Sequence, residues 1–148
     1  MLANATQLNT PGMALGGLAA VHALTDVTGF GLLGHLLEIC RASEVGARLV
    51  FDRVPLLPGV LALARAGVIT GASARNWAGY RDEVRLRGGD GFAAQALLTD
   101  PQTSGGLLVA CAPDAVEDVL AVFSNERFEH AAVIGDITAA PARIVVDC

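Results

Sequence analysis

The sequence predicts a layered α/β domain in which helices pack against a mixed sheet. Short apolar runs typical of buried strands alternate with segments of helical period along most of the chain. The length of 148 residues is close to that of one domain, and a hydrophobic fraction of 53% supplies enough apolar side chains for a core. The expected strands are 18–24, 48–51, 106–111, 131–137 and 143–146, and the expected helices are 30–42, 58–66 and 113–124.

The helix expected at 30–42 has the clearest pattern, because its apolar residues recur at the spacing of one helical face. Thr28 precedes it and is a typical N-cap residue. We therefore expect Thr28 to cap this helix and the apolar face to be buried. That face consists of Leu33, Leu36, Leu37 and Cys40.

Charged side chains are scarce in this chain. They make up 17% of the residues, against about 25% in an average domain, so we expect part of the apolar surface to meet another domain. The net charge is -5 and there is no lysine, which argues against nucleic-acid binding and excludes lysine-based catalysis within the chain. No apolar run reaches the roughly 18 residues of a membrane span, so no membrane partner is expected.

The first residues have the composition of a connecting segment. They are small and partly polar, and they end in the turn residues Pro11 and Gly12. We expect residues 1–12 to be a linker or the tail of a missing upstream domain, and residues 13–148 to form the domain itself. Residues 1–25 carry no charged side chain, but the absence of a basic n-region and the polar residues within them argue against a secretory signal.

The cysteines and histidines do not form the pattern of a metal site. Cys40, Cys111 and Cys148 are an odd number without CxxC spacing, which indicates neither a disulfide framework nor a zinc site and favours a reducing, cytoplasmic setting. The first two lie on an apolar helix face and in a buried strand, so we expect them to be structural. His22 and His35 lack the paired spacing of metal ligands, and packing or surface roles are expected for both.

The segment 25–35, TDVTGFGLLGH, places an acidic residue and a glycine-rich turn between a strand and a helix start, where anions can bind. We call it the first block. Asp26 suits a site where a carboxylate and substrate phosphates share Mg²⁺, although it could instead merely cap the turn into the helix. The glycines also match the GxGxxG fingerprint of nicotinamide dinucleotide-binding domains, with Asp52 after the next strand, but Asp26 would repel a bare pyrophosphate. The fingerprint glycines are Gly29, Gly31 and Gly34.

Two further stretches are rich in turn residues. The segment 99–106, TDPQTSGG, combines Asp-Pro with Gly-Gly, which by itself favours a structural turn before a strand. The segment 71–91 holds five glycines and no clean period, so we expect a long surface excursion. Its arginines could approach phosphate or a partner domain, but a solvated loop explains them as well. They are Arg75, Arg81, Arg85 and Arg87.

Taken together, these stretches resemble a known family. TDVTGFGLLGH in the first block and DPQTSGGLL at 100–108, which we call the second block, resemble the two signature blocks of the carboxy-terminal domain of selenophosphate synthetases. GASARNWAGY at 71–80 more loosely resembles a loop of bacterial members, but departs from their usual glycine pairing. The resemblance covers nearly the whole chain. It implies a fold similar to the carboxy-terminal domain of aminoimidazole ribonucleotide synthetase.

The resemblance also implies an activity, in which selenide, ATP and water are converted to selenophosphate, AMP and phosphate with the help of Mg²⁺. Asp26 matches the family's carboxylate that helps to hold Mg²⁺ at the ATP phosphates. Thr28 and Gly29 lie where a hydroxyl and a backbone amide could face the same phosphates, although capping explains them equally well.

The family's nucleophilic cysteine or selenocysteine, its neighbouring lysine and most of its metal-binding aspartates belong to an amino-terminal ATP-binding domain. This chain has no such segment. We therefore expect the chain alone to be inactive, its partner to be that domain, and the full-length enzyme to be a homodimer. A nicotinamide dinucleotide-binding domain and a non-catalytic binding module remain as alternatives.

Overall fold

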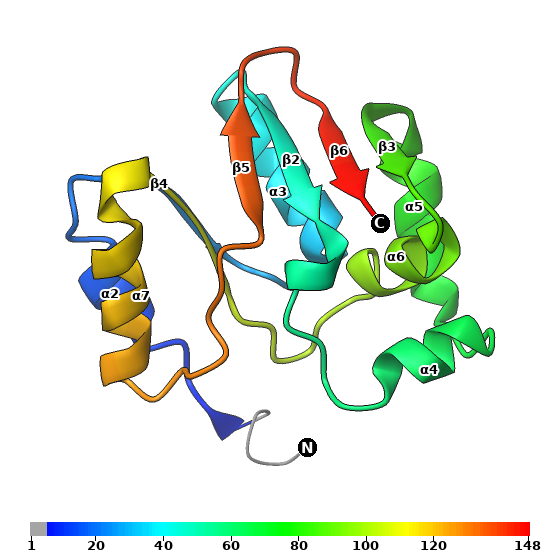
Figure 1. The fold of residues 1–148 in the computed structure, drawn as a ribbon, viewed down its shortest axis with the longest axis horizontal. Helices are drawn as coiled ribbons and strands as arrows, with labels where there is room; N and C mark the ends of the chain where they lie inside the picture. Colours follow the sequence, from blue (N-terminus) through cyan, green and yellow to red (C-terminus); the bar gives the residue numbers. More distant parts are fainter. Residues whose placement is uncertain (1–5) are drawn as a thin grey trace.

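The computed structural model describes residues 6–148, which form a four-stranded mixed sheet, a separate pair of strands, and helices packed on them (Figure 1). This arrangement confirms the expected α/β class with a mixed sheet. The strands are β1 Val21–Asp26, β2 Gly46–Val50, β3 Val84–Arg87, β4 Leu107–Cys111, β5 Gly135–Thr138 and β6 Ile144–Asp147. The helices are α2 Pro11–Leu15, α3 Gly31–Ala42, α4 Val60–Arg65, α5 Gly71–Tyr80, α6 Gly91–Leu98 and α7 Val116–Asn125, with 3₁₀ turns at Phe51–Arg53, Arg81–Glu83 and Pro113–Ala115.

The larger sheet has the strand order β3-β6-β2-β5, in which β3, β6 and β2 are parallel and β5 is antiparallel. Side chains alternate between its faces, as expected for period-two strands. Ala47, Leu49 and Ile144 point into the core, whereas Arg48 and Arg85 are exposed on the other face. One face of this sheet therefore carries the helices and the other is open.

Helix α3 provides much of the core on the covered face of the sheet, and it lies behind β2 in Figure 1. The apolar residues at the predicted helical spacing are buried, which confirms the expected face. The helix ends at Ala42 as predicted and begins at Gly31, one residue later than predicted. Leu33 and Leu37 belong to one cluster with Leu49 and Val146 of the sheet. Burial of this face is what fixes α3 on the sheet.

The strand pair β1–β4 is antiparallel and lies apart from the larger sheet, with α2 and α7 packed on it (Figure 1). Leu15 of α2 and Val119 and Phe123 of α7 form a second, smaller core. Asp26 at the end of β1 is paired in register with Leu107 at the start of β4. This register brings the start of the first block next to the second.

Most predicted elements exist, with shifted ends. The helix predicted at 58–66 is shorter, because Gly59 adopts a left-handed conformation and α4 starts only after it. The strand predicted at 131–137 reaches the ladder only at its end, as β5. The helix predicted at 113–124 opens with a 3₁₀ turn before α7 begins.

The predicted surface excursion at 71–91 is wrong. This segment contains α5, a 3₁₀ turn and β3, and α6 begins at its end. In α5 the inward-facing residues recur at helical spacing. Ser73 is buried, and Asn76, Trp77 and Tyr80 are partly buried. That face is partly polar, which hid the helical period in a search for apolar residues.

The amino-terminal segment packs on the domain from residue 9 onward. The Asn9 side chain donates a hydrogen bond to the Gly105 carbonyl at 3.0 Å, and Pro11 is buried at the start of α2. Residues 1–5 of the expected linker lie outside the described residues, and the division at Gly12 stays a prediction. None of the helices in the described part of the chain has the length and hydropathy that a membrane span requires.

Candidate functional site

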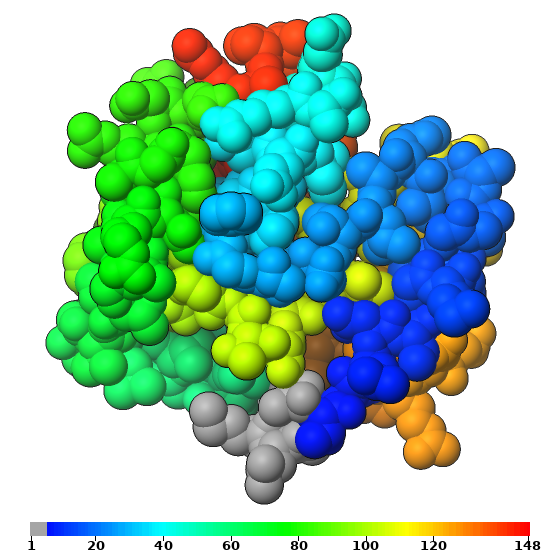
Figure 2. All heavy atoms as spheres, turned by 180° about the vertical axis from the view of Figure 1, so that it is seen from behind, coloured from blue at the N-terminus to red at the C-terminus, as the bar shows by residue number. Residues whose placement is uncertain are grey.

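The two blocks, far apart in sequence, form one continuous surface. The Val27 amide donates to the Gly106 carbonyl at 2.9 Å, which extends the β1–β4 ladder beyond Asp26. The Gln102 amide donates to the Thr28 carbonyl at 3.0 Å. Figure 2 shows the result from behind, with the first block in blue, the second block in yellow-green below it and α5 in green beside them. We call this contact the block junction.

Two glycines make the junction possible. A Cβ on Gly105 would lie 1.8 Å from the Val27 carbonyl oxygen, which no real side chain allows. Gly31 has a φ of +70°, and a Cβ there would lie 2.6 Å from the Thr99 carbonyl carbon. Only glycine tolerates such close backbone approach together with a positive φ. One glycine of each block, Gly31 and Gly105, therefore allows this close approach.

Helix α5 ties the two blocks together through one amide group. The Asn76 Nδ2 group donates to the Gly29 carbonyl of the first block and to the Thr99 carbonyl beside the second, both at 2.9 Å. One turn earlier, the Ser73 hydroxyl lies 2.5 Å from the Thr99 hydroxyl and donates to the Ala96 carbonyl at 3.0 Å. The loosely resembling stretch thus belongs to the site.

Tyr80 completes this polar face of α5. Its hydroxyl donates to the Phe30 carbonyl at 2.9 Å. Burial raises the pKa of Tyr80 to about 12, so the phenol stays protonated and remains a donor at neutral pH. Sequence reasoning missed Ser73, Asn76 and Tyr80 as site residues. The signal that could have found them is their spacing of three and then four residues, which places them on one face of a helix.

The residues predicted for metal and phosphate binding are brought together at the junction. Asp26 and Thr28 directly precede and follow the buried Val27 in the sequence, and both are exposed. Gly29 follows them, and a Cβ built on it would meet no atom within 4 Å. No described residue contributes a hydrogen bond or an ion pair to the Asp26 carboxylate. These three positions thus face open space, and the hydrogen bonds of the block junction hold the segment that carries them.

The predicted N-cap role of Thr28 is wrong, and the capping alternative for Asp26 is not supported. Phe30 occupies the N-cap position of α3, and no side chain caps it. The Thr28 hydroxyl lies instead 3.0 Å from Nε2 of His35. The chain passes through an additional turn before the helix, with the Gly31 amide bonded to the Thr28 carbonyl. This turn moves both polar side chains away from the free amides of α3.

His35 is more than a packing residue. Its side chain is 9% exposed, and its Nδ1 atom lies 2.9 Å from Oε2 of Glu38. Together with the contact to Thr28, both ring nitrogens are engaged. His22 and His130 are exposed and take no part in this network.

The chain supplies neither a complete metal centre nor an activated thiol among its described residues. Residues 6–148 hold no cluster of three or more histidine, cysteine or acidic side chains that could bind a metal. Cys40, Cys111 and Cys148 are free thiols, and burial is the main cause that raises the pKa of each. A raised thiol pKa disfavours the nucleophilic thiolate, in agreement with the structural role expected for Cys40 and Cys111.

The geometry excludes the nicotinamide interpretation of the glycines. A dinucleotide-binding unit needs its first two strands to be parallel in one sheet. Here β1 pairs with β4, and β2 belongs to the other sheet. Gly34 allows close packing instead, because a Cβ there would lie 3.2 Å from Cε1 of Tyr80.

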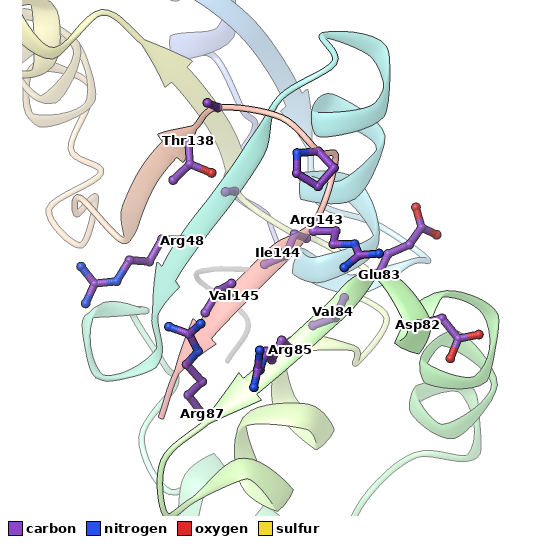
Figure 3. A pocket seen from close by; sticks show the side chains of 13 residues that line it. Arg48, Asp82, Glu83, Val84, Arg85, Arg87, Thr138, Arg143, Ile144 and Val145 are labelled. Carbon is purple, nitrogen blue, oxygen red and sulfur yellow. The ribbon is translucent and has the colours of Figure 1, made fainter.

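A separate hollow of about 550 Å³ lies on the open face of the larger sheet (Figure 3). Arg85 and Arg87 of β3 line it, and so does Arg48, which pairs with Asp147 at 2.5 Å. Helix α3 packs on the opposite face of this sheet. Of the four arginines expected in a solvated loop, Arg85 and Arg87 therefore lie on a strand, whereas Arg75 lies on α5 and Arg81 in the 3₁₀ turn that follows it.

The chain matches one protein-family model over most of its length. Residues 10–147 match the model described as AIR synthase related protein, C-terminal domain. The chain therefore belongs to this family, as the resemblance of its fold to the carboxy-terminal domain of aminoimidazole ribonucleotide synthetase implied.

Curated relatives agree with the sequence resemblance. The chain is 60% identical over 146 residues to a protein of Burkholderia pseudomallei named selenide, water dikinase, and the match covers 99% of the chain and 41% of that protein. A protein of the same name from Pseudomonas straminea is 55% identical over 141 residues, covering 95% of the chain and 40% of that protein. The chain thus spans about two fifths of these relatives.

Solved structures share the fold at low identity. HypE of E. coli, a hydrogenase maturation protein, has a TM-score of 0.68 and 18% identity, covering 97% of this chain and 37% of that one. Thiamine-monophosphate kinase from Stenotrophomonas maltophilia has a TM-score of 0.54 and 20% identity, covering 86% of this chain and 32% of that one. At these identities the likeness shows the fold alone.

We expect Gly105→Ala to destabilise the chain by at least about 1 to 3 kcal/mol, because the added methyl collides with the Val27 carbonyl oxygen. Gly106→Ala is the matched control, since a Cβ there meets no atom within 4 Å, and its effect should stay within about 0.5 kcal/mol. Urea unfolding of both variants measures the difference. Equal stability of the two would contradict the close approach of the blocks.

We expect Asn76→Ala to cost about 1 to 3 kcal/mol, because two backbone carbonyls lose their donor. Arg75→Ala, at an exposed position of the same helix, should change stability by no more than about 0.5 kcal/mol. Thermal and urea unfolding provide the measurement. A cost for Asn76→Ala no larger than that of the control would mean that the amide does not hold the junction.

Proposed function

We propose that this chain is the carboxy-terminal domain of a selenide, water dikinase and forms one wall of its metal–nucleotide site. The carrying observation is the Asp26 carboxylate, exposed and without a described partner, on the rigid block junction. The names of relatives that match 99% of the chain support the reaction class. One of the fold neighbours, a HypE with a TM-score of 0.62, was solved in complex with ATP.

The donor set at the junction fits a shared Mg²⁺ rather than an independent one. Mg²⁺ prefers oxygen ligands and is usually held by one or two carboxylates together with substrate phosphates. Asp26 offers one carboxylate, and no cluster of three acidic residues exists in 6–148. Asp26 would hold the cation from this side, and the bound cation would neutralise charge on the phosphates.

The remaining role of this chain is to hold the backbone at Gly29 in place and to leave space there for the phosphates. Gly29 presents backbone without a side chain, so phosphates can approach closely at this point. Asn76 fixes the Gly29 carbonyl and thereby holds the peptide in place. Because the free thiols have raised pKa values and lysine is absent, the nucleophile and most metal ligands must come from elsewhere.

The amino-terminal domain expected from the resemblance would supply these groups, and the chain alone would make no selenophosphate. The proposal also includes a homodimer of the full-length protein, which rests on the resemblance alone. A cytoplasmic location is proposed from the cysteines, which are free at all three positions.

We expect Asp26→Asn in the full-length protein to lower turnover of ATP with selenide by at least about 10- to 100-fold, because one anionic ligand of the cation is lost. The melting temperature should not change, since the carboxylate makes no described contact. Asp52→Asn is the matched control, at another exposed aspartate, and should leave turnover unchanged. Near-normal turnover and unchanged Mg²⁺ dependence of Asp26→Asn would contradict the metal role.

A further inference from the structure

The open face of the larger sheet concentrates positive charge in an acidic protein. The chain has 10 basic residues, all of them arginine, against 15 acidic ones, and its net charge is -5. Four of these arginines line the hollow of Figure 3, whereas no residue of either block lines it. They are Arg48, Arg85, Arg87 and Arg143. The hollow is therefore a surface feature separate from the block junction.

The register of the strands fixes where these arginines lie on the face. Arg85 of β3 and Arg48 of β2 are both paired with Val145 of β6, the strand between them, so the three residues form one row across the sheet. Two positions further along β3, Arg87 is exposed on the same face as Arg85 (Figure 3). Because the ladder holds the strands, the spacing between these side chains is set by the backbone.

The acidic side chains around the hollow leave two of the arginines without a partner. The ion pairs at this face are those of Asp147 with Arg48 at 2.5 Å, of Glu83 with Arg41 of α3, and of Asp82 with Arg81 at 3.9 Å, while Arg143 adds a weaker attraction to Glu83 and Asp136 of β5 lies opposite Arg48. Within residues 6–148, no side chain forms an ion pair or a hydrogen bond with the guanidinium group of Arg85 or Arg87. These two groups present unpaired positive charge to solvent.

The spacing of the two unpaired arginines matches that of an extended polypeptide. Residues two positions apart in a strand lie about 6.4 to 6.8 Å apart and point to the same side. Acidic side chains at alternate positions of an extended ligand recur at the same interval, so two of them can meet Arg85 and Arg87 in register. A guanidinium group binds a carboxylate through two parallel hydrogen bonds, and each of these arginines can form such a pair.

Other anionic ligands fit this face less well. A site for a small molecule surrounds most of its ligand, whereas all four arginines here are exposed on an open sheet face. Proteins that bind single-stranded nucleic acid stack the bases on aromatic side chains, and none of the described residues that line the hollow is aromatic. The net charge of -5 also repels a nucleic acid at long range. An acidic polypeptide remains as the ligand that the charge and the spacing favour.

We propose that the open face of the larger sheet is a docking surface for a partner protein that presents an extended segment with acidic side chains at alternate positions. Arg85 and Arg87 pair with two of these side chains, and Arg48 and Arg143 add positive charge around them. Val145, partly buried in the same row, offers apolar contact to the aliphatic part of the segment. The proposal is independent of the proposed function, because no residue of either block lines the hollow.

Binding of labelled model peptides to the full-length protein, measured by fluorescence anisotropy, tests the surface. The probe is a peptide in which glutamate and threonine alternate. A second peptide has the same composition but carries its glutamates in one contiguous run, so that it differs in spacing and not in charge. We expect the alternating peptide to bind at least about threefold more tightly than the contiguous one, and its affinity to fall as the salt concentration rises.

Charge reversal locates the binding surface. Arg85→Glu and Arg87→Glu should each weaken binding of the alternating peptide by at least about tenfold, because a like charge then faces the ligand. Arg127→Glu, at an exposed position after α7, changes the net charge equally and should weaken binding by less than about twofold. Turnover of ATP with selenide should not change in any of the three. If a reversed variant fails to fold, Arg85→Gln and Arg87→Gln remove the charge and should lower affinity in the same direction.

The contrary outcomes are distinct. No saturable binding of the alternating peptide up to about 1 mM would overturn the proposal, and so would equal losses in Arg85→Glu and Arg127→Glu, which would show attraction by net charge alone. Displacement of the peptide by millimolar inorganic phosphate, or tighter binding of polyuridylic acid at the same arginines, would identify another class of ligand and overturn it. Self-association of the unmutated protein that Arg85→Glu abolishes would identify a second copy as the occupant and overturn it as well.

Discussion

The site depends on one amide group, that of Asn76, which donates both of its hydrogens to backbone carbonyls of separate loops. The two loops are rich in glycine and small polar residues, so apolar burial, at Val27 and Leu108, leaves much of the task of holding them together to hydrogen bonds. Backbone hydrogen bonds between Val27 and Gly106 and the Asn76 amide fill this role. A polar network whose members are all satisfied is rigid, and rigidity is what a binding surface requires.

Because hydrogen bonds already hold the block junction in place, the chain needs only a few functional groups to form part of a binding site. Asp26 has an exposed carboxylate, Gly29 has open backbone, and the thiols are disfavoured as nucleophiles because burial raises their pKa. Such a set suits one wall of a shared site. The length of the relatives, of which the chain spans 41%, agrees with a second part that supplies the rest.

Sequence patterns predicted the elements whose cause is local. The face of α3 with Leu33 and Leu37 follows from apolar periodicity, and the apolar run at 18–24 predicted a strand that exists with shifted ends, as β1 at Val21–Asp26. The sequence could not show that β1 leaves the larger sheet to pair with β4, because register is a tertiary property. The sequence also could not show which face of α5 packs inward. That face is partly polar, and its role becomes clear only from the two carbonyls to which Asn76 donates. The contact between Thr28 and His35 was hidden in the same way, because the sequence does not show the additional turn between Thr28 and α3.

Hydrogen–deuterium exchange of the full-length protein, with and without Mg-ATP, tests most directly whether the block junction faces the metal–nucleotide. Slower exchange is expected in peptides that cover residues 27–31 and 100–106, because a ligand held at Asp26 excludes water and restrains both blocks. Exchange in peptides that cover β5 and β6, on whose open face the arginine-lined hollow lies, should not change. Protection of β5 and β6 without protection of the two blocks would contradict the assignment of the site.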